Sequence, residues 1–128
     1  MIDHIGVVVS DYAKSKAFYA QALAPTGHSR VVELPGALAG RRDTAGFCHE
    51  DGSDFWISQG DAKTPPLHVA FRVSSRAAVD AFHQAAIAAG GKDNGAPGLR
   101  PQYHPDYYGA YVLDPDGHNI EAVCHEAA

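Results

Sequence analysis

Two stretches of the chain repeat each other: HIGVVVS at residues 4–10 and HVAFRVS at residues 68–74, 64 positions apart. Each copy is a short apolar run, then a serine, then a helical pattern of apolar residues. A repeat of this length indicates a duplicated supersecondary unit. The duplication places His4 and His68 at equivalent points, so that two histidines from two half-domains can face each other.

Length and composition favour a single globular domain, residues 1–128. The chain has 128 residues, of which 45% are hydrophobic and 20% charged, as in ordinary globular proteins. Its net charge of −5 and the lack of a basic run argue against nucleic acid as a partner. No apolar run has the length of a membrane span, and the N-terminus lacks signal-peptide regions. We therefore expect a cytoplasmic protein that binds no membrane.

The first copy predicts a strand, a helix and three further strands. The β-branched run at 2–9 indicates a strand, and the apolar stripe from Tyr12 to Leu23 has helical spacing. Asp51-Gly52 is a hairpin turn signal. The three later strands are predicted at 28–34, 45–49 and 54–59.

The second copy repeats this order after a polar, proline-bearing linker at 60–66. Its elements are predicted as a strand at 67–73, a helix at 75–89, a weak strand inside a mobile loop over 92–102, and strands at 108–113 and 118–124. The predicted fold class is α+β, with two tandem βαβββ modules at residues 1–60 and 66–125. We expect these modules to form curved mixed sheets around a cavity.

The last predicted hairpin carries a second signature, Asp114-Pro115-Asp116-Gly117-His118-Asn119-Ile120-Glu121. With the duplicated unit and the histidine that starts each copy, it makes the whole chain resemble the vicinal oxygen chelate superfamily. That superfamily includes glyoxalase I, fosfomycin-resistance proteins, bleomycin-binding proteins and extradiol dioxygenases. The resemblance implies that His4, His68 and Glu121 line one cavity and hold a divalent metal.

The residue types in this triad suit metal chemistry. Two neutral imidazoles and one carboxylate bind Fe(II), Mn, Ni, Zn or Co and leave coordination positions open for substrate oxygens. An ion held in this way stabilises negative charge that develops on two adjacent oxygens. The leading hypothesis is therefore a metal-dependent enzyme for a small molecule with vicinal oxygens, either a ring-cleaving dioxygenase or a glyoxalase-like lyase.

Trp56 marks a departure from the family pattern. Alignment of the two hairpins on Gly52 and Gly117 places Trp56 opposite Glu121 in the repeat. In glyoxalase I the matching position is usually a fourth metal ligand, and an indole nitrogen is only a hydrogen-bond donor. Trp56 is instead predicted to be an aromatic wall that binds a flat substrate. This favours the alternative function, a non-catalytic drug-binding protein of the bleomycin-resistance type.

Further candidate site residues cluster before the strand at 108–113. His104 and Tyr108 are predicted to be catalytic, as an acid or base or as donors to an oxyanion. Tyr103 and Tyr107 are predicted to contact substrate, as is Arg72, which lies two positions after His68 on the same face of a strand. The modules can face each other within one chain or across a homodimer, and open sheet edges favour the homodimer.

Overall fold

The computed structural model describes residues 1–34, 36, 42–50, 52–62 and 64–128; Asp51 of the predicted hairpin turn lies outside them. The first module consists of β1 (Ile5–Val9), α1 (Tyr12–Ala22), a short 3-10 helix (Ala24–Thr26), β2 (Arg30–Leu34), β3 (Thr44–His49) and β4 (Gly52–Gln59). The second consists of β5 (His68–Val73), α2 (Arg76–Ala88), β6 (Lys92–Leu99), β7 (Tyr108–Leu113) and β8 (Asn119–Cys124). The predicted order of strands and helices is confirmed.

The two helices begin at capping residues that the sequence supplies. The side chain of Asp11 accepts a hydrogen bond from the Lys14 backbone N–H, and the Ser75 hydroxyl accepts one from Ala78. These bonds satisfy N–H groups that have no partner within the helix. Within the described ranges, neither helix is long and apolar enough to cross a membrane.

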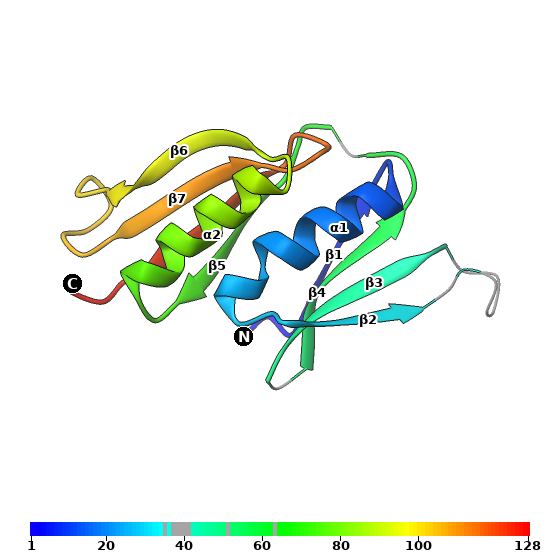
Figure 1. Cartoon of the computed structure of the whole chain (residues 1–128), viewed down its shortest axis with the longest axis horizontal. Helices are drawn as coiled ribbons and strands as arrows, with labels where there is room; N and C mark the ends of the chain where they lie inside the picture. Colours follow the sequence, from blue (N-terminus) through cyan, green and yellow to red (C-terminus); the bar gives the residue numbers. More distant parts are fainter. Residues whose placement is uncertain (35, 37–41, 51, 63) are drawn as a thin grey trace.

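Both modules form a four-stranded mixed sheet of the same topology. The strand order is β1-β4-β3-β2 in one sheet and β5-β8-β7-β6 in the other. The pairs β1/β4 and β5/β8 are parallel, and the other neighbours are antiparallel. The identical order confirms the duplication and the α+β fold class. Figure 1 shows α1 and α2 side by side, each lying against its own sheet.

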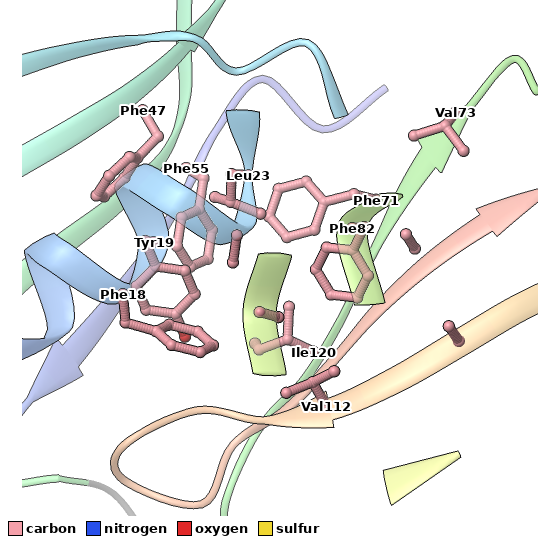
Figure 2. Packing of buried hydrophobic residues seen from close by; sticks show 14 of the residues in the cluster. Phe18, Tyr19, Leu23, Phe47, Phe55, Phe71, Val73, Phe82, Val112 and Ile120 are labelled. Atoms are coloured by element: carbon pink, nitrogen blue, oxygen red, sulfur yellow. The ribbon is translucent and has the colours of Figure 1, made fainter. Parts of the chain in front are cut away.

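One face of each sheet packs on the helices and forms a common core. Successive strand residues point to opposite faces, so apolar side chains such as Phe55 and Phe71 alternate with residues on the other face. Phe55 and Phe71 come from different modules, and their ring centroids are 5.3 Å apart (Figure 2). The helix-free faces carry the candidate site residues His68, Trp56 and Glu121.

The signature hairpin also ties the modules together. The Tyr19 hydroxyl on α1 donates to the buried carboxylate of Asp114, and the Ser10 hydroxyl donates to Asp116. Asp114 also accepts backbone hydrogen bonds from Asp116 at 2.9 Å and His118 at 2.8 Å. The Asp-Pro-Asp-Gly turn is therefore fixed by its own backbone and by the first module at the same time.

The region predicted as a weak strand inside a mobile loop is a strand over most of its length. β6 pairs with β7, with register shifts between Asp93 and Gly95 and between Gly95 and Gly98. Glycines at these shifts disrupt the regular pattern that a strand shows in sequence. Backbone pairing with β7 nevertheless extends the strand to Leu99.

Candidate functional site

Glu121 lies at the centre of the helix-free face of the second sheet. In the register of β8 it is opposite Ala70 of β5 and Tyr111 of β7. Its side chain is buried, although it carries a carboxylate, and only 1% of the residue is exposed. Buried charges need partners, because removal from water disfavours the charged form.

Two side chains contact the Glu121 carboxylate. His68 Nε2 lies 3.1 Å from Oε1, and the Tyr107 hydroxyl donates a hydrogen bond to Oε2. Gly109 leaves the space that the carboxylate occupies, because a Cβ atom there would lie 3.2 Å from Oε2. Glu121, His68 and Gly109 lie in one sheet, and Tyr107 lies in the loop directly before β7. This part of the site is therefore formed within the second module.

The His68 ring is oriented by its second nitrogen. Nδ1 lies 3.1 Å from the backbone carbonyl oxygen of Asn119, which only accepts hydrogen bonds, so Nδ1 carries a proton. In the neutral imidazole, Nε2 is then unprotonated, and it lies 3.1 Å from Glu121 Oε1 without the alignment of a hydrogen bond. Two lone pairs at this distance repel each other unless a proton or a cation lies between them.

The spacing of these two atoms fits a shared metal ion. Ligand atoms held about 2.1 Å from one ion and near a right angle to each other are roughly 3 Å apart. His68 Nε2 and Glu121 Oε1 are 3.1 Å apart. One imidazole nitrogen and one carboxylate oxygen are also the donor types that Mn, Fe(II), Ni, Co and Zn bind.

The tyrosines next to Glu121 are held in their protonated form. Burial, then the hydrogen bond and charge of Glu121, raise the pKa of Tyr107 well above its usual value. Burial and the Glu121 charge also raise the pKa of Tyr111. Near neutral pH, Tyr107 is therefore a hydrogen-bond donor to the carboxylate rather than a base.

His4 lies outside the pair formed by His68 and Glu121. Its Nδ1 is 2.6 Å from Asp3 Oδ2, and its side chain is 60% exposed. It borders an open pocket of about 540 Å³ that His68 also lines, and a second pocket that contains Trp56. Among the residues that the structure describes, no three His, Cys, Asp or Glu side chains are grouped so that they could hold a metal ion.

Trp56 occupies the position in the first sheet that Glu121 occupies in the second. Trp56 is opposite Gly6 and Gly46, as Glu121 is opposite Ala70 and Tyr111. The predicted equivalence of the two positions is therefore confirmed. The indole ring lies over Gly46, where a Cβ atom would come 2.7 Å from it, and its nitrogen donates to the Ser53 carbonyl at 3.0 Å.

Tyr108 points away from Glu121. In β7 it alternates with Gly109 and lies on the helix side of the sheet, where its hydroxyl donates to Asp80 of α2 at 2.7 Å. The hydrogen bond to Asp80, followed by burial, raises the pKa of Tyr108. Strand alternation separates Tyr108 from Tyr107, although the two are adjacent in sequence.

His104 and Tyr103 lie around the Tyr107 ring, with centroids 5.5 Å and 4.9 Å from it. The His104 Nδ1 accepts a hydrogen bond from the Asp106 N–H at 3.1 Å, so in the neutral ring Nε2 carries the proton. That nitrogen lies 2.6 Å from Nδ1 of His125. His104 is thus half of a histidine pair close to Glu121's hydrogen-bond partner.

Arg72 follows His68 on the same face, as its position in the strand predicts. Its guanidinium is 3.9 Å from Glu126, and its side chain is 71% exposed. It therefore lies at the rim of the helix-free face.

Three further residues of this region were not predicted from the sequence as site residues: Tyr111, Arg100 and His125. Tyr111 lies beside Glu121, and its ring centroid is 6.2 Å from that of His68. The Arg100 guanidinium carbon lies 5.5 Å from the centroid of the Tyr111 ring. The repeat could have indicated Tyr111, because it follows Gly46 by the same 65 positions that separate Glu121 from Trp56. Gly46 and Trp56 are opposite each other in the first sheet, as Tyr111 and Glu121 are in the second.

Comparisons with known proteins agree with this architecture. The glyoxalase/bleomycin resistance protein from Albidiferax ferrireducens T118 is 30% identical, with a TM-score of 0.77 over 95% of this chain and 97% of its own. A glyoxalase/bleomycin resistance protein/dioxygenase family enzyme from Burkholderia phytofirmans PsJN is 20% identical, with a TM-score of 0.70 over 98% of both chains.

A third similar structure is a mutant of the fosfomycin resistance protein FosX from Listeria monocytogenes, in complex with Mn(II) and 1S,2S-dihydroxypropylphosphonic acid. It is 22% identical, with a TM-score of 0.68 over 96% of this chain and 88% of its own. No curated protein matches the chain. The sequence model of one family matches residues 1–122. The chain therefore belongs to the Glyoxalase/Bleomycin resistance protein/Dioxygenase superfamily.

Proposed function

We propose that the protein is a metal-dependent enzyme that acts on a small molecule with vicinal oxygens. The observation that carries this proposal is the 3.1 Å approach of His68 Nε2 to Glu121 Oε1, with the imidazole proton placed on the opposite nitrogen by Asn119. A cation between the two atoms removes the repulsion of their lone pairs. Family membership and the Mn(II) complex of FosX support the same type of site.

The proposed metal is one of Fe(II), Mn, Ni, Zn and Co, and when bound it supplies charge stabilisation to two adjacent substrate oxygens. Tyr107 keeps its hydroxyl proton and orients Glu121. Asn119 fixes the tautomer of His68. Outer partners of this kind set ligand orientation and basicity. Ring-cleaving dioxygenase and glyoxalase-like lyase chemistry both use such a site.

We assign proton transfer to the pair of His104 and His125. The two imidazoles are linked by a 2.6 Å contact and stack with an interplanar angle of 22°. His104 Nε2 carries the proton of this contact and His125 Nδ1 accepts it, so the pair can pass a proton from one ring to the other. Tyr108 is absent from this proposal because its hydroxyl is bound to Asp80 on the far side of the sheet.

His4 is proposed as the third ligand, supplied by a second copy of the chain. Its Nε2 has no hydrogen-bond partner among the described residues, and it shares the helix-free face of the first sheet with Trp56. A homodimer in which the first sheet of one copy faces the second sheet of the other brings His4 to His68 and Glu121. The same arrangement covers two sheet faces that a single chain leaves open.

Metal content tests the proposal directly. Untagged protein, soaked separately in Fe(II), Mn(II), Ni(II) and Zn(II) and then desalted, is expected to retain about one ion per chain. His68→Ala and Glu121→Gln are expected to weaken retention at least about tenfold. His83→Ala is the matched control, because His83 lies on α2 and binds Asp93. Negligible metal in wild type, or equal retention in all four proteins, contradicts the proposal.

Mixing two inactive variants tests the shared site. In a homodimer with crossed sites, His4→Ala and His68→Ala chains that are unfolded and refolded together form one intact site per mixed dimer. Metal binding then recovers to about a quarter of the wild-type level, since half of the dimers are mixed. If each site forms within one chain, the mixture binds no more than the separate variants.

The second candidate function is a metal-free binder of aromatic compounds. The observation that favours it is the placement of the Trp56 ring against Gly46, on the sheet position where Glu121 lies in the other module. Quenching of the single tryptophan by catechols or drugs in the presence of a chelator, with no metal retention, is the result that this function predicts.

A further inference from the structure

We propose that Arg100 binds an anionic group, a carboxylate or a phosphonate, on the molecule whose vicinal oxygens reach His68 and Glu121. The vicinal oxygens belong to the proposed function. The anion site itself involves the Arg100 guanidinium, the Tyr111 ring of β7 beneath it and the irregular strand β6, which ends just before Arg100.

The Arg100 guanidinium is fixed in place but has no carboxylate partner in the part of the chain that the structure describes. Nη2 donates a 2.7 Å hydrogen bond to the Ala96 carbonyl, and the guanidinium lies over the Tyr111 ring. Among the described residues, the ion pairs of arginine are those of Arg72 with Glu126 and Arg76 with Asp106. A positioned guanidinium with free N–H groups and no compensating charge is suited to a planar or tetrahedral anion.

Two glycines of β6 make room for this arrangement. A Cβ atom at Gly95 would lie 2.8 Å from Tyr111 Cδ2 and 3.4 Å from Arg100 Nη2. A Cβ atom at Gly98 would lie 3.1 Å from Arg100 Nη1. Gly95 also has a φ of +153°, which side-chain-bearing residues rarely adopt. The register shifts of β6 occur at the same two glycines. The irregular strand is therefore built around the stacked pair, and such preorganisation lowers the entropy cost of binding.

Tyr111 connects the anion site to the proposed metal ligands. It is opposite Glu121 in the sheet, and the strand order β5-β8-β7-β6 places β7 between Glu121 of β8 and the strand that leads to Arg100. Its ring centroid is 6.2 Å from that of His68 and 5.5 Å from the Arg100 guanidinium carbon. A molecule that lies along the Tyr111 ring thus places its oxygens and its anionic group at opposite ends.

NMR titration of the full chain tests the anion site without relying on metal. Benzoate and methylphosphonate are the two anionic probes, and benzamide is the neutral match for benzoate. At least one anion is expected to give saturable shifts of the Arg100 Nε–H and the Tyr111 amide, and benzamide none. The stronger of the two anions identifies the group as carboxylate or phosphonate.

Variants make the test specific. Arg100→Met is expected to weaken anion binding at least tenfold, and Arg100→Lys, which keeps the charge, is expected to lose less. Arg76→Met is the matched control, because Arg76 also lies over a tyrosine, Tyr108, but is paired with Asp106. Its anion binding is expected to match wild type.

Two titration results overturn the inference: saturable shifts that benzamide produces as strongly as the anions, or no saturable shift at Arg100 with either anion. Unchanged affinity in Arg100→Met does the same. Because the titration is run on metal-free protein, loss of the anion site leaves the metal-retention result unaffected. Failure of metal retention likewise leaves the anion result unaffected, so the two proposals fail separately.

Discussion

Replacement of Tyr107 by phenylalanine removes one hydroxyl beside Glu121 and keeps the ring. That hydroxyl donates to Oε2 of a carboxylate that is 1% exposed, so water does not replace it. The ring contacts with His104 and His125, at 5.5 Å and 5.3 Å, need no hydroxyl. The variant therefore removes a hydrogen bond to a buried charge and keeps the packing of the ring.

The expected loss follows from the charge of the acceptor. A hydrogen bond to an ionised group contributes about 1.5–3 kcal/mol, and removal of one partner leaves the buried carboxylate less stabilised. We expect the free energy of unfolding of metal-free Tyr107→Phe to fall by about 1.5–3 kcal/mol at pH 7. Metal affinity is expected to fall about 10–100-fold, because the hydroxyl orients a metal ligand.

Urea denaturation measures the first quantity, and competition with a chromophoric chelator measures the second. Tyr103→Phe is the control: the Tyr103 side chain is largely exposed and its hydroxyl has no partner among the described residues. Its stability is expected to change by less than about 0.5 kcal/mol. If Tyr107→Phe matches this control in both stability and metal affinity, the proposed support of Glu121 by Tyr107 is refuted.

Three further predictions follow from the core and the sheet faces. Gly46→Ala is expected to displace the ring of Trp56, the single tryptophan, and to lower the free energy of unfolding by about 1–3 kcal/mol. Gly6→Ala is the control and is expected to be neutral, because nothing lies within 4 Å of the added Cβ. Tryptophan emission reports the ring displacement and urea denaturation reports the stability, and unchanged emission in Gly46→Ala contradicts the packing. Phe71→Ala is expected to destabilise the protein by about 3–5 kcal/mol, since Phe71 fills the core between the modules, and thermal unfolding that matches wild type would exclude that role. Burial and Asp114 raise the pKa of Tyr19, and burial and Glu33 raise that of Tyr12 to about 12. The stabilisation that goes with a raised pKa is fully present below the unfolded tyrosine pKa, near 10, and is lost as the pH rises through the folded pKa. The free energy of unfolding is therefore expected to fall above about pH 10. Tyrosinate absorbance at alkaline pH checks this: Tyr12 and Tyr19 are expected to ionise at higher pH in the folded protein than in denaturant.

The sequence predicts most of the fold because the repeat fixes it. Apolar runs at 4–10 and 68–74 start equivalent strands, and each later strand and α-helix of one copy has a counterpart in the other. β6 is the exception, since Gly95 and Gly98 interrupt the period of two on which strand prediction depends. Those glycines accommodate Tyr111 and Arg100, which are distant contacts that local sequence does not reveal.

The site is predictable in part for the same reason. The repeat relates His4 to His68 and Trp56 to Glu121, and the register confirms that second relation. Which side chains meet across strands depends on alternation and register, and a shift of one residue reverses the face. Tyr107 and Tyr108 therefore separate, one bound to Glu121 and the other to Asp80.

The contact between Phe55 and Phe71 bears on how such a chain can have arisen. A polypeptide with one repeat alone would expose its aromatic surface to water, because the partner ring belongs to the other repeat. Descent from a single-repeat ancestor then requires that ancestor to have been self-associating, with two identical halves meeting as the fused halves meet now. After such a fusion the two halves are free to differ, as Trp56 and Glu121 do at equivalent positions.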